Sequence, residues 1–206
     1  MRLLELFCGT KSVSKAVGHY FTEIVSLDID PKAQPTICAN ILTWDYTIYP
    51  RDYFHTIWAS PPCTEYSHIR FSRPEYPRNL PLADSIVLKV LEIIDYFNPI
   101  RWYIENPQTG LLKDREFMDG IPYYDVDYCQ YSHWGYRKRT RIWTTVLDFK
   151  PKVCTLTCPN RVGIGKPHKT PIANTVMMRR MNSQGTTLNE RHRIPPALLT
   201  ALFAVF

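Results

Sequence analysis

No stretch of this chain reaches the length of a membrane span. Its 206 residues contain nothing close to the roughly 18 consecutive apolar residues that crossing a bilayer requires. The opening MRLLELFCG is too short for the apolar part of an export signal and is typical of a buried strand. Internal repeats and low-complexity tracts are also missing. These absences exclude membrane-spanning and repeat proteins and argue against secretion.

A disulfide framework is equally absent from the pattern of cysteines. The six cysteines stand at positions 8, 38, 63, 129, 154 and 158, without the spacing of a small disulfide-bonded domain. With no export signal, we expect reduced thiols and a location in the cytoplasm or nucleus. Cys63 is therefore free either to pack or to react.

The composition indicates a soluble globular protein of one domain. Hydrophobic residues make up 45% of the chain and charged residues 21%, which excludes a disordered protein. The length suffices for one domain with a real core and is too short for two ordinary ones. A net charge of +6 favours an acidic partner such as nucleic acid, although a basic surface can also serve solubility alone.

Short apolar runs alternate with amphipathic stretches through the first half of the chain. We expect strands at 2–7, 23–30, 35–41, 54–60 and 100–107, and helices at 12–20 and 82–97. This alternation predicts an α/β domain whose doubly wound sheet is mostly parallel, with helices on both faces. Two later runs, 123–130 and 140–149, indicate a pair of further strands.

The remainder of the chain divides into two parts. Residues 150–190 are rich in Pro, Gly, Asn, Lys and Arg and show no periodicity, which is typical of a functional loop or small subdomain. The run PPALLTALFAVF begins with prolines at a helix start and continues as an apolar helix. We therefore predict a core of 1–149, an insertion of 150–190, and a helix in 191–206 that returns to the core.

Polar residues follow one predicted strand after another. FCGT, DID, AN, SPPC and EN each stand where a strand ends. In a doubly wound sheet, ligands bind beyond the carboxyl ends of the strands. These residues are therefore expected to form a single site.

Seven segments carry a family resemblance: LELFCGTKSVSKAVG, SLDID, CANI, SPPCTEYS, YIENP, YCQYSHWGYRKRTRIWT and ERHRIPPALL. In this order and spacing they resemble the DNA cytosine-5 methyltransferases, in particular the compact forms of bacteriophages and large DNA viruses. They cover nearly the whole chain except 150–190. The resemblance implies a Rossmann-like, S-adenosylmethionine-dependent methyltransferase fold with a short target-recognition insertion. It also implies a monomer that acts on double-stranded DNA in the cytoplasm or nucleus of the host cell.

The resemblance gives Cys63 the role of nucleophile. Carbon 5 of cytosine is too electron-poor to take a methyl group directly, and a thiolate that adds to carbon 6 makes carbon 5 nucleophilic. Basic residues near a loop after a strand are expected to lower the pKa of the Cys63 thiol toward neutrality. The alternative is a cysteine that simply packs.

Glu105 matches the family glutamate that contacts ring nitrogen 3 of the cytosine, where a shared proton stabilises the charge as the thiolate adds. The alternative is a carboxylate satisfied by a helix N-terminus. Asn106 is expected to hold the geometry of the loop.

Arg139 and Arg141 match the arginines of the family motif Gln-x-Arg-x-Arg, and Arg141 would reach cytosine O2 and the catalytic carboxylate. The glutamine position falls on Arg137 or Tyr136. The alternative for RKRTR is a solvated basic face that binds phosphate.

Cofactor contacts are expected from the same comparison. Asp28 fits the acid that hydrogen-bonds ribose hydroxyls, and Asn40 stands where relatives often carry an aspartate that faces adenine. Lys11 occupies the position of the second glycine of the family's first motif, so its side chain must point away from the cofactor. The expected contacts with S-adenosylmethionine are Phe7, Gly9, Thr10, Asp28, Ile29, Asn40, Ile41 and Pro61.

An enzyme of this kind must flip its target base out of the duplex. The loop 64–79 interleaves basic and aromatic side chains suited to phosphate contacts and to filling the vacated stack, namely Tyr66, His68, Arg70, Phe71, Arg73, Tyr76 and Arg78. Target reading falls to 150–190, through Lys150, Lys152, Arg161, Lys166, Lys169, Arg179 and Arg180. Among these we favour Arg161 as the base reader, because Gly163 and Gly165 would let its loop approach the groove.

Two questions stay open at this point. Cys154, Cys158 and His168 invite a zinc site, but no fourth ligand is evident and the Cys-x3-Cys spacing is loose, so we expect loop packing and no metal. The function also has two alternatives to DNA methylation: methylation of cytosine in RNA, or a catalytically inactive methyltransferase-like domain that binds nucleic acid.

Overall fold

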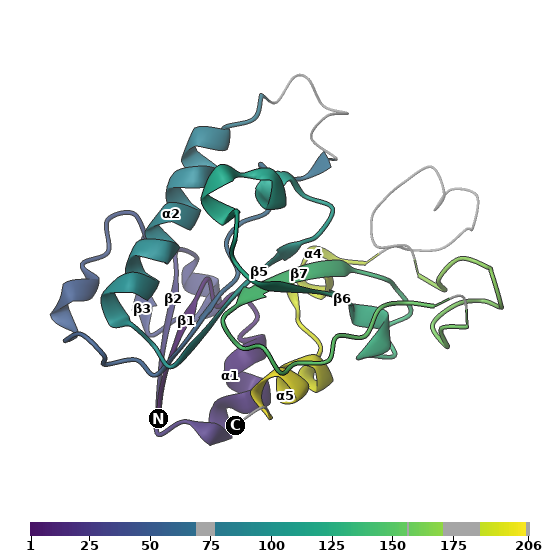
Figure 1. Cartoon of the computed structure of the whole chain (residues 1–206), viewed down its shortest axis with the longest axis horizontal. Helices are drawn as coiled ribbons and strands as arrows, with labels where there is room; N and C mark the ends of the chain where they lie inside the picture. Colours follow the sequence, from purple (N-terminus) through teal and green to yellow (C-terminus); the bar gives the residue numbers. More distant parts are fainter. Residues whose placement is uncertain (69–76, 156, 171–185, 205–206) are drawn as a thin grey trace.

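The computed structural model describes residues 1–68, 77–155, 157–170 and 186–204 (Figure 1). Within these residues no helix is both long and apolar enough to cross a membrane. The predicted α/β architecture is confirmed: one central sheet carries helices on both of its faces.

The sheet has seven strands in the order β3-β2-β1-β4-β5-β7-β6. Of these seven strands, β7 runs in the opposite direction to the other six. The sheet is therefore mostly parallel, as predicted. The strands are β1 Arg2–Leu6, β2 Glu23–Asp28, β3 Ile37–Cys38, β4 Thr56–Ala59, β5 Arg101–Pro107, β6 Tyr123–Asp127 and β7 Arg139–Thr144.

Helix α2 covers one face of the sheet, and α1 and α5 cover the other (Figure 1). The α-helices are α1 Ser12–Val17, α2 Leu80–Phe97, α4 Leu188–His192 and α5 Pro196–Phe203. Short 3-10 turns lie at Gly18–Tyr20, Pro31–Ala33, Tyr46–Ile48, Leu111–Asp114, Glu116–Met118 and Tyr128–Gln130. Asn79 begins α2, since its side chain accepts the N–H of Leu82 at 3.1 Å. Asn98 ends it in the left-handed conformation, at φ 43°.

Alternation along the strands divides the core into two halves. Leu4 and Leu6 of β1 face α2, whereas Leu3 between them faces α1 and α5. The ring of Phe203 in α5 stacks on Tyr103 of β5 with centroids 5.1 Å apart. The C-terminal helix thus packs against the same sheet face as α1, on the side from which Glu105 also projects.

Most of the predicted strands are shorter in the structure, and two of them are shortened the most. The run 35–41 contributes only Ile37–Cys38, because the chain turns where the Asn40 carbonyl accepts the N–H groups of Thr43 and Trp44. The last strand ends at Thr144 rather than 149, where the Thr144 hydroxyl oxygen accepts the N–H of Val146 at 3.1 Å. A backbone turn thus ends the first of these strands, and a side-chain hydrogen bond to nearby backbone ends the second.

A helix that periodicity did not reveal crosses the predicted boundary between the insertion and the C-terminal part, at residues 190 and 191. Helix α4 is a single short turn held by a capping box between Thr187 and Glu190. In 150–155 and 157–170 the structure has neither helix nor strand, apart from an isolated antiparallel bridge between Arg161 and His168.

Candidate active site

One cavity of about 790 Å³ lies beyond the carboxyl ends of β1, β2, β4 and β5. Asp28 and Ile29 line it after β2, and Cys63 and Glu105 line it after β4 and in β5. Four of the five predicted strand-end segments, FCGT, DID, SPPC and EN, therefore converge on one site, and AN does not line it. Of the expected cofactor residues, the cavity is lined by Phe7, Gly9, Thr10, Asp28, Ile29 and Pro61.

Cys63 follows β4 in a loop that β5 holds in place. The side-chain amide of Asn106 donates to the carbonyl of Pro61 at 2.9 Å, and Asn106 is buried. This hydrogen bond joins the cysteine loop to the neighbouring strand, as expected of Asn106. The thiol itself is partly exposed in the cavity wall.

The pKa of Cys63 is raised rather than lowered, which corrects the expectation drawn from its basic surroundings. Burial raises the pKa most, and the nearby Glu105 raises it further. Lys138 and Arg191 act in the opposite direction. In the protein by itself, loss of hydration outweighs the attraction of the two cations.

Glu105 is a buried carboxylate with two partners on one oxygen. It is 5% exposed, and its Oε1 atom accepts the hydroxyl of Tyr128 at 3.0 Å and lies 3.2 Å from the ammonium nitrogen of Lys138. These hydrogen bonds do not come from a helix N-terminus. The alternative prediction, a Glu105 carboxylate satisfied by a helix N-terminus, is therefore wrong. Tyr128 and Lys138 were both missed as members of the site.

Arg141 does not contact Glu105, contrary to the expectation from the family motif. Its guanidinium makes a two-pronged ion pair with Asp125, at 2.7 and 2.8 Å, and lies over the ring of Tyr123. The bond to Asp125 raises the pKa of Arg141. Of the residues in RKRTR, Lys138 occupies the place beside the carboxylate.

The pairing register of β5 and β7 explains why Lys138, and not Arg141, lies beside Glu105. Glu105 pairs with Ile142 across the antiparallel β5–β7 ladder, so the two side chains project from the same face. Because side chains alternate along a strand, Lys138 shares the face of Ile142, while Arg139 and Arg141 project from the other. Sequence spacing alone does not reveal which face meets Glu105.

Arg137, one of the two residues that could occupy the glutamine position, pairs with the fully buried Asp127 at 2.9 and 3.1 Å. Arg139 lies 3.5 Å from the same carboxylate, so it too is turned away from Glu105. Burial pushes the pKa of Asp127 upward, but Arg137, the N–H of Cys154 and Arg139 together hold it below its ordinary value.

At the opposite end of the cavity, Asp28 organises the first two strand-end loops. One of its carboxylate oxygens accepts the N–H of Gly9 at 2.8 Å and the other accepts that of Asp30 at 2.9 Å. Ile29 between them is 67% exposed and lines the cavity. An acceptor group thus stands next to an uncovered apolar side chain.

Lys11 adopts a left-handed backbone conformation, which favours glycine. Its φ of 55° and ψ of 38° are left-handed, and it forms the N-cap of α1. Below it, the buried Glu5 accepts the N–H groups of Val13 and Ser14 at 3.3 and 3.2 Å. The sequence signal for Glu5, a lone acid inside an apolar strand, was overlooked.

Asn40 and Ile41 do not line the cavity among the residues that the structure describes. Ile41 is buried in the core, and the side-chain oxygen of the exposed Asn40 accepts the N–H of Leu42 at 3.0 Å. Neither residue lines this cavity, so the expected contacts of Asn40 with adenine and of Ile41 with the cofactor stay predictions.

Tyr66 is likewise corrected by the structure. It is fully buried and its hydroxyl donates to Asp84 at 2.9 Å, so it cannot fill a vacated base stack. The guanidinium of Arg78 donates to the carbonyl of Ser67 at 2.6 Å. The other expected DNA contacts Arg70, Phe71, Arg73, Tyr76, Arg179 and Arg180 lie outside the described residues.

Helix α4 brings two further residues to the cavity, Asn189 and His192. Partial burial, together with the nearby Lys138 and Arg191, lowers the pKa of His192. Its surroundings therefore favour the neutral imidazole. No motif in the sequence pointed to these two side chains.

Comparisons with known proteins give the family of the chain. A protein from Frog virus 3 (isolate Goorha), described as "Probable DNA (cytosine-5)-methyltransferase", is 37% identical over 216 residues, which cover 98% of each chain. No family model matches.

Among solved structures, a Spodoptera frugiperda DNMT2 variant matches with a TM-score of 0.51 and 18% identity, over 81% of this chain and 57% of its own. A candidate DNA modification methyltransferase encoded within an E. coli prophage also gives 0.51, at 13% identity, over 75% and 52%. The chain thus spans just over half the length of these two, which share its fold. By its full-length similarity to the viral relative, the chain belongs to the DNA cytosine-5 methyltransferase family.

Proposed function

We propose that this protein transfers a methyl group from S-adenosylmethionine to carbon 5 of cytosine in DNA. The observation that carries the proposal is the shared cavity: Cys63 and Glu105 line the same space as Asp28 and Ile29. A nucleophile and a carboxylate therefore stand at one end, and a nucleoside-binding pair at the other. The viral relative supports the same activity.

The residues present fit the cofactor. Asp28 offers carboxylate oxygens to ribose hydroxyls, and the exposed Ile29 offers an apolar surface to an adenine ring. Gly9 and Thr10 line the adjoining wall and would border the methionine part. When bound, S-adenosylmethionine supplies an electrophilic methyl group.

The catalytic residues act on the cytosine. The Cys63 thiolate forms a bond to carbon 6, and the ring electrons move toward carbon 5 and nitrogen 3. Glu105, held by Tyr128 and Lys138, donates a proton toward nitrogen 3 and so stabilises that charge. After carbon 5 has gained the methyl group, water takes up its remaining proton, the sulfur–carbon bond breaks to regenerate the thiolate, and nitrogen 3 returns its proton to Glu105.

Lys138 contributes the positive charge that the family motif would assign to an arginine. Its ammonium group pairs with Glu105 and lowers the pKa of Cys63, so it acts on both reacting side chains. A base drawn into the cavity would displace water from around all three groups, which strengthens their interactions.

We further propose that the protein works as a monomer on double-stranded DNA, with 150–190 reading the target. The described part of this region presents exposed Lys150, Lys166 and Lys169. The surface charge suits phosphate contacts, which supply most non-specific affinity for DNA. Methylation of RNA cytosine would need the same chemistry and is the second outcome of the experiment below.

Transfer of labelled methyl groups to matched DNA and RNA substrates tests the proposal. Wild-type protein should label DNA, and bisulfite sequencing should place the mark on carbon 5 of cytosine. Cys63→Ser should fold, bind cofactor and lose methylation by several orders of magnitude, because a hydroxyl is far less nucleophilic. Label on RNA alone would reassign the substrate, and label from Cys63→Ser near the wild-type rate would overturn the mechanism.

A further inference from the structure

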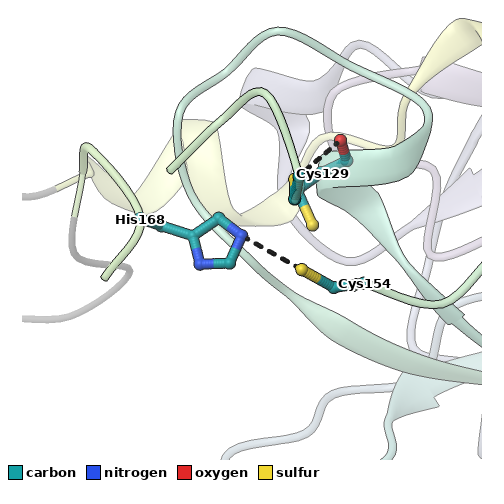
Figure 2. Close-up of side chains that lie close together, drawn as sticks. Cys129, Cys154 and His168 are labelled. Carbon is teal, nitrogen blue, oxygen red and sulfur yellow. Dashed lines mark hydrogen bonds between the residues drawn. The ribbon is translucent and has the colours of Figure 1, made fainter. Parts of the chain in front are cut away.

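Four side chains with metal-binding atoms meet beside β6, away from the cavity: Cys129, Cys154, Cys158 and His168. Their ligand atoms all lie within 4.8 Å of one another. The Cys154 sulfur is 3.4 Å from Nε2 of His168, and Figure 2 shows that imidazole directed at the sulfur with Cys129 close by. Three sulfurs and one nitrogen form one of the ligand sets of structural zinc sites.

The spacing fits a single tetrahedral ion. Zinc–sulfur bonds of about 2.3 Å and zinc–nitrogen bonds of about 2.0–2.1 Å place neighbouring ligand atoms about 3.5–3.8 Å apart. The measured 3.4 Å between Cys154 and His168 is already at that separation, and the upper limit of 4.8 Å requires only small side-chain adjustments. An iron–sulfur cluster, which interposes several atoms, would hold its ligands farther apart.

Cys129 is the fourth ligand that the sequence did not reveal. It follows β6 in the turn Tyr128–Gln130, 25 positions before Cys154. The other three candidates belong to the segment after β7. A shared ion would therefore fasten that segment to the edge of the sheet next to Tyr128, the partner of Glu105.

Hydrogen bonds hold the candidate ligands in position. The buried Asp127 accepts the N–H of Cys154 at 2.7 Å. The buried Asn160 donates to the carbonyls of Cys129 and Ser132 at 2.7 and 2.8 Å and accepts the N–H of Gly135 at 3.0 Å. These hydrogen bonds fix the backbone of Cys129 and Cys154. Metal ligands are commonly held in place by such supporting hydrogen bonds.

The described residues of 150–170 form little of a hydrophobic core. Among the described residues of 150–170, only Cys158 and Asn160 are buried. Val153, Val162 and Ile164 are 50%, 58% and 80% exposed. A stretch that buries so little apolar surface cannot offset the entropy lost on ordering it, whereas a bound zinc ion contributes folding free energy directly.

We propose that Cys129, Cys154, Cys158 and His168 bind one structural zinc ion that fastens residues 152–170 to the edge of the sheet. All four positions belong to protein side chains, so the ion has no open position for substrate and serves structure rather than chemistry. The six cysteines are free thiols in the structure, as such a site needs. The proposal does not depend on the methyltransferase activity.

Metal analysis of the full-length protein, purified with reductant and without added metal, tests this directly. About one zinc per chain is expected. Cobalt exchanged into the site should show the intense visible bands of a tetrahedral ion and the near-ultraviolet bands of thiolate coordination. Wild-type protein that is folded, binds neither metal and unfolds at the same temperature with and without a chelator would overturn the proposal.

Single substitutions then test each ligand. Cys129→Ser and Cys158→Ser should each weaken zinc binding by more than about 100-fold, because loss of a mere hydrogen-bonding partner of a ligand already costs about 10–100-fold. Cys38→Ser is the matched control: Cys38 is an exposed thiol outside the group, and its loss should leave one zinc per chain.

Proteolysis gives a readout that needs no variant. Chelation should expose 152–170 to cleavage and leave the sheet intact, and added zinc should restore protection.

If Cys129→Ser keeps the wild-type zinc content and cobalt spectrum, Cys129 is not a ligand. Because these measurements use no DNA, they can fail while methylation is observed, or succeed while it is not.

Discussion

Lys138 places its ammonium nitrogen 3.2 Å from the Oε1 atom of Glu105, inside the cavity that Cys63 also lines. Both side chains are largely buried. This pair joins the carboxylate to the one cation of RKRTR that reaches the site among the described residues. A buried pair of this kind is costly to break from either side, because the remaining charge loses its partner.

Lys138→Met should move the pH dependence of Cys63 reactivity to higher pH. Burial raises the pKa of the thiol and Lys138 lowers it, so removing the cation raises the pKa further. At a given pH the thiolate fraction then falls. Alkylation of Cys63 by iodoacetamide, followed against pH, should show its rising limb displaced upward, and methyl transfer should fall with it. Arg139→Met removes the same charge from the opposite strand face and should leave the alkylation profile in place.

Glu105→Gln should lose both stability and activity, and a second substitution should separate the two losses. The change leaves Lys138 buried without an anion, which costs about 3–5 kcal/mol of unfolding free energy. Adding Lys138→Met should recover most of that stability, measured by urea unfolding. Methyl transfer should stay low in the double variant, because neither residue can move a proton. Recovered methylation would make Glu105 structural only.

Arg141→Met distinguishes the family expectation from the contacts in the structure. Because Arg141 bonds to Asp125 and not to Glu105, we expect lower stability and a methylation rate within about tenfold of wild type. A double-mutant cycle with Asp125→Ala should give a coupling energy of about 1–3 kcal/mol. A rate as low as that of Glu105→Gln, with stability unchanged, would return Arg141 to the catalytic centre.

The difference between Lys138 and Arg141 marks the limit of sequence reasoning for this protein. The apolar runs predicted every strand of the sheet, and Cys63 and Glu105 fell at strand positions that meet one cavity. Which face of β7 meets Glu105 depends on register across two antiparallel strands, and that register is set by tertiary packing. Linear spacing of basic residues carries no such information.

Cys129 was missed for a related physical reason. A metal site is recognised in a sequence by short spacings, and Cys154, Cys158 and His168 alone did not complete a set. The fourth sulfur, that of Cys129, precedes β7 in the sequence, whereas the other three candidate ligands follow it.

Tyr66 shows the opposite error: its loop composition indicated an exposed aromatic side chain, whereas its ring packs in the core beneath α2.

Asp28→Ala should weaken S-adenosylmethionine binding by about 1–3 kcal/mol, or about 5–150-fold, measured by calorimetry. Two effects add: ribose hydroxyls lose an acceptor, and the N–H of Gly9 loses the oxygen that positions its loop. Asp30→Ala is the control. Asp30 lines the same cavity but its carboxylate accepts the N–H of Lys32, so its loss should cost less affinity. Equal losses would mean that Asp28 acts only through general negative charge.

Lys11→Gly should preserve or raise the stability of the protein, although glycine usually weakens a helix start. Lys11 is held at φ 55°, and the left-handed conformation costs a residue with a side chain roughly 1–2 kcal/mol. Glycine avoids that cost but adds about 0.5–1 kcal/mol of backbone entropy loss on folding, so the net change should lie between zero and about 1.5 kcal/mol of stabilisation. Lys15→Gly, the same exchange four residues later inside α1, should instead destabilise by about 1 kcal/mol, because Lys15 is helical. Urea unfolding of the two variants should therefore give changes of opposite sign or, at the least, a clear difference in favour of Lys11→Gly. Equal destabilisation by both would show that Lys11 is not left-handed in solution, and the first loop would then need a different conformation from the one that brings Gly9 to Asp28.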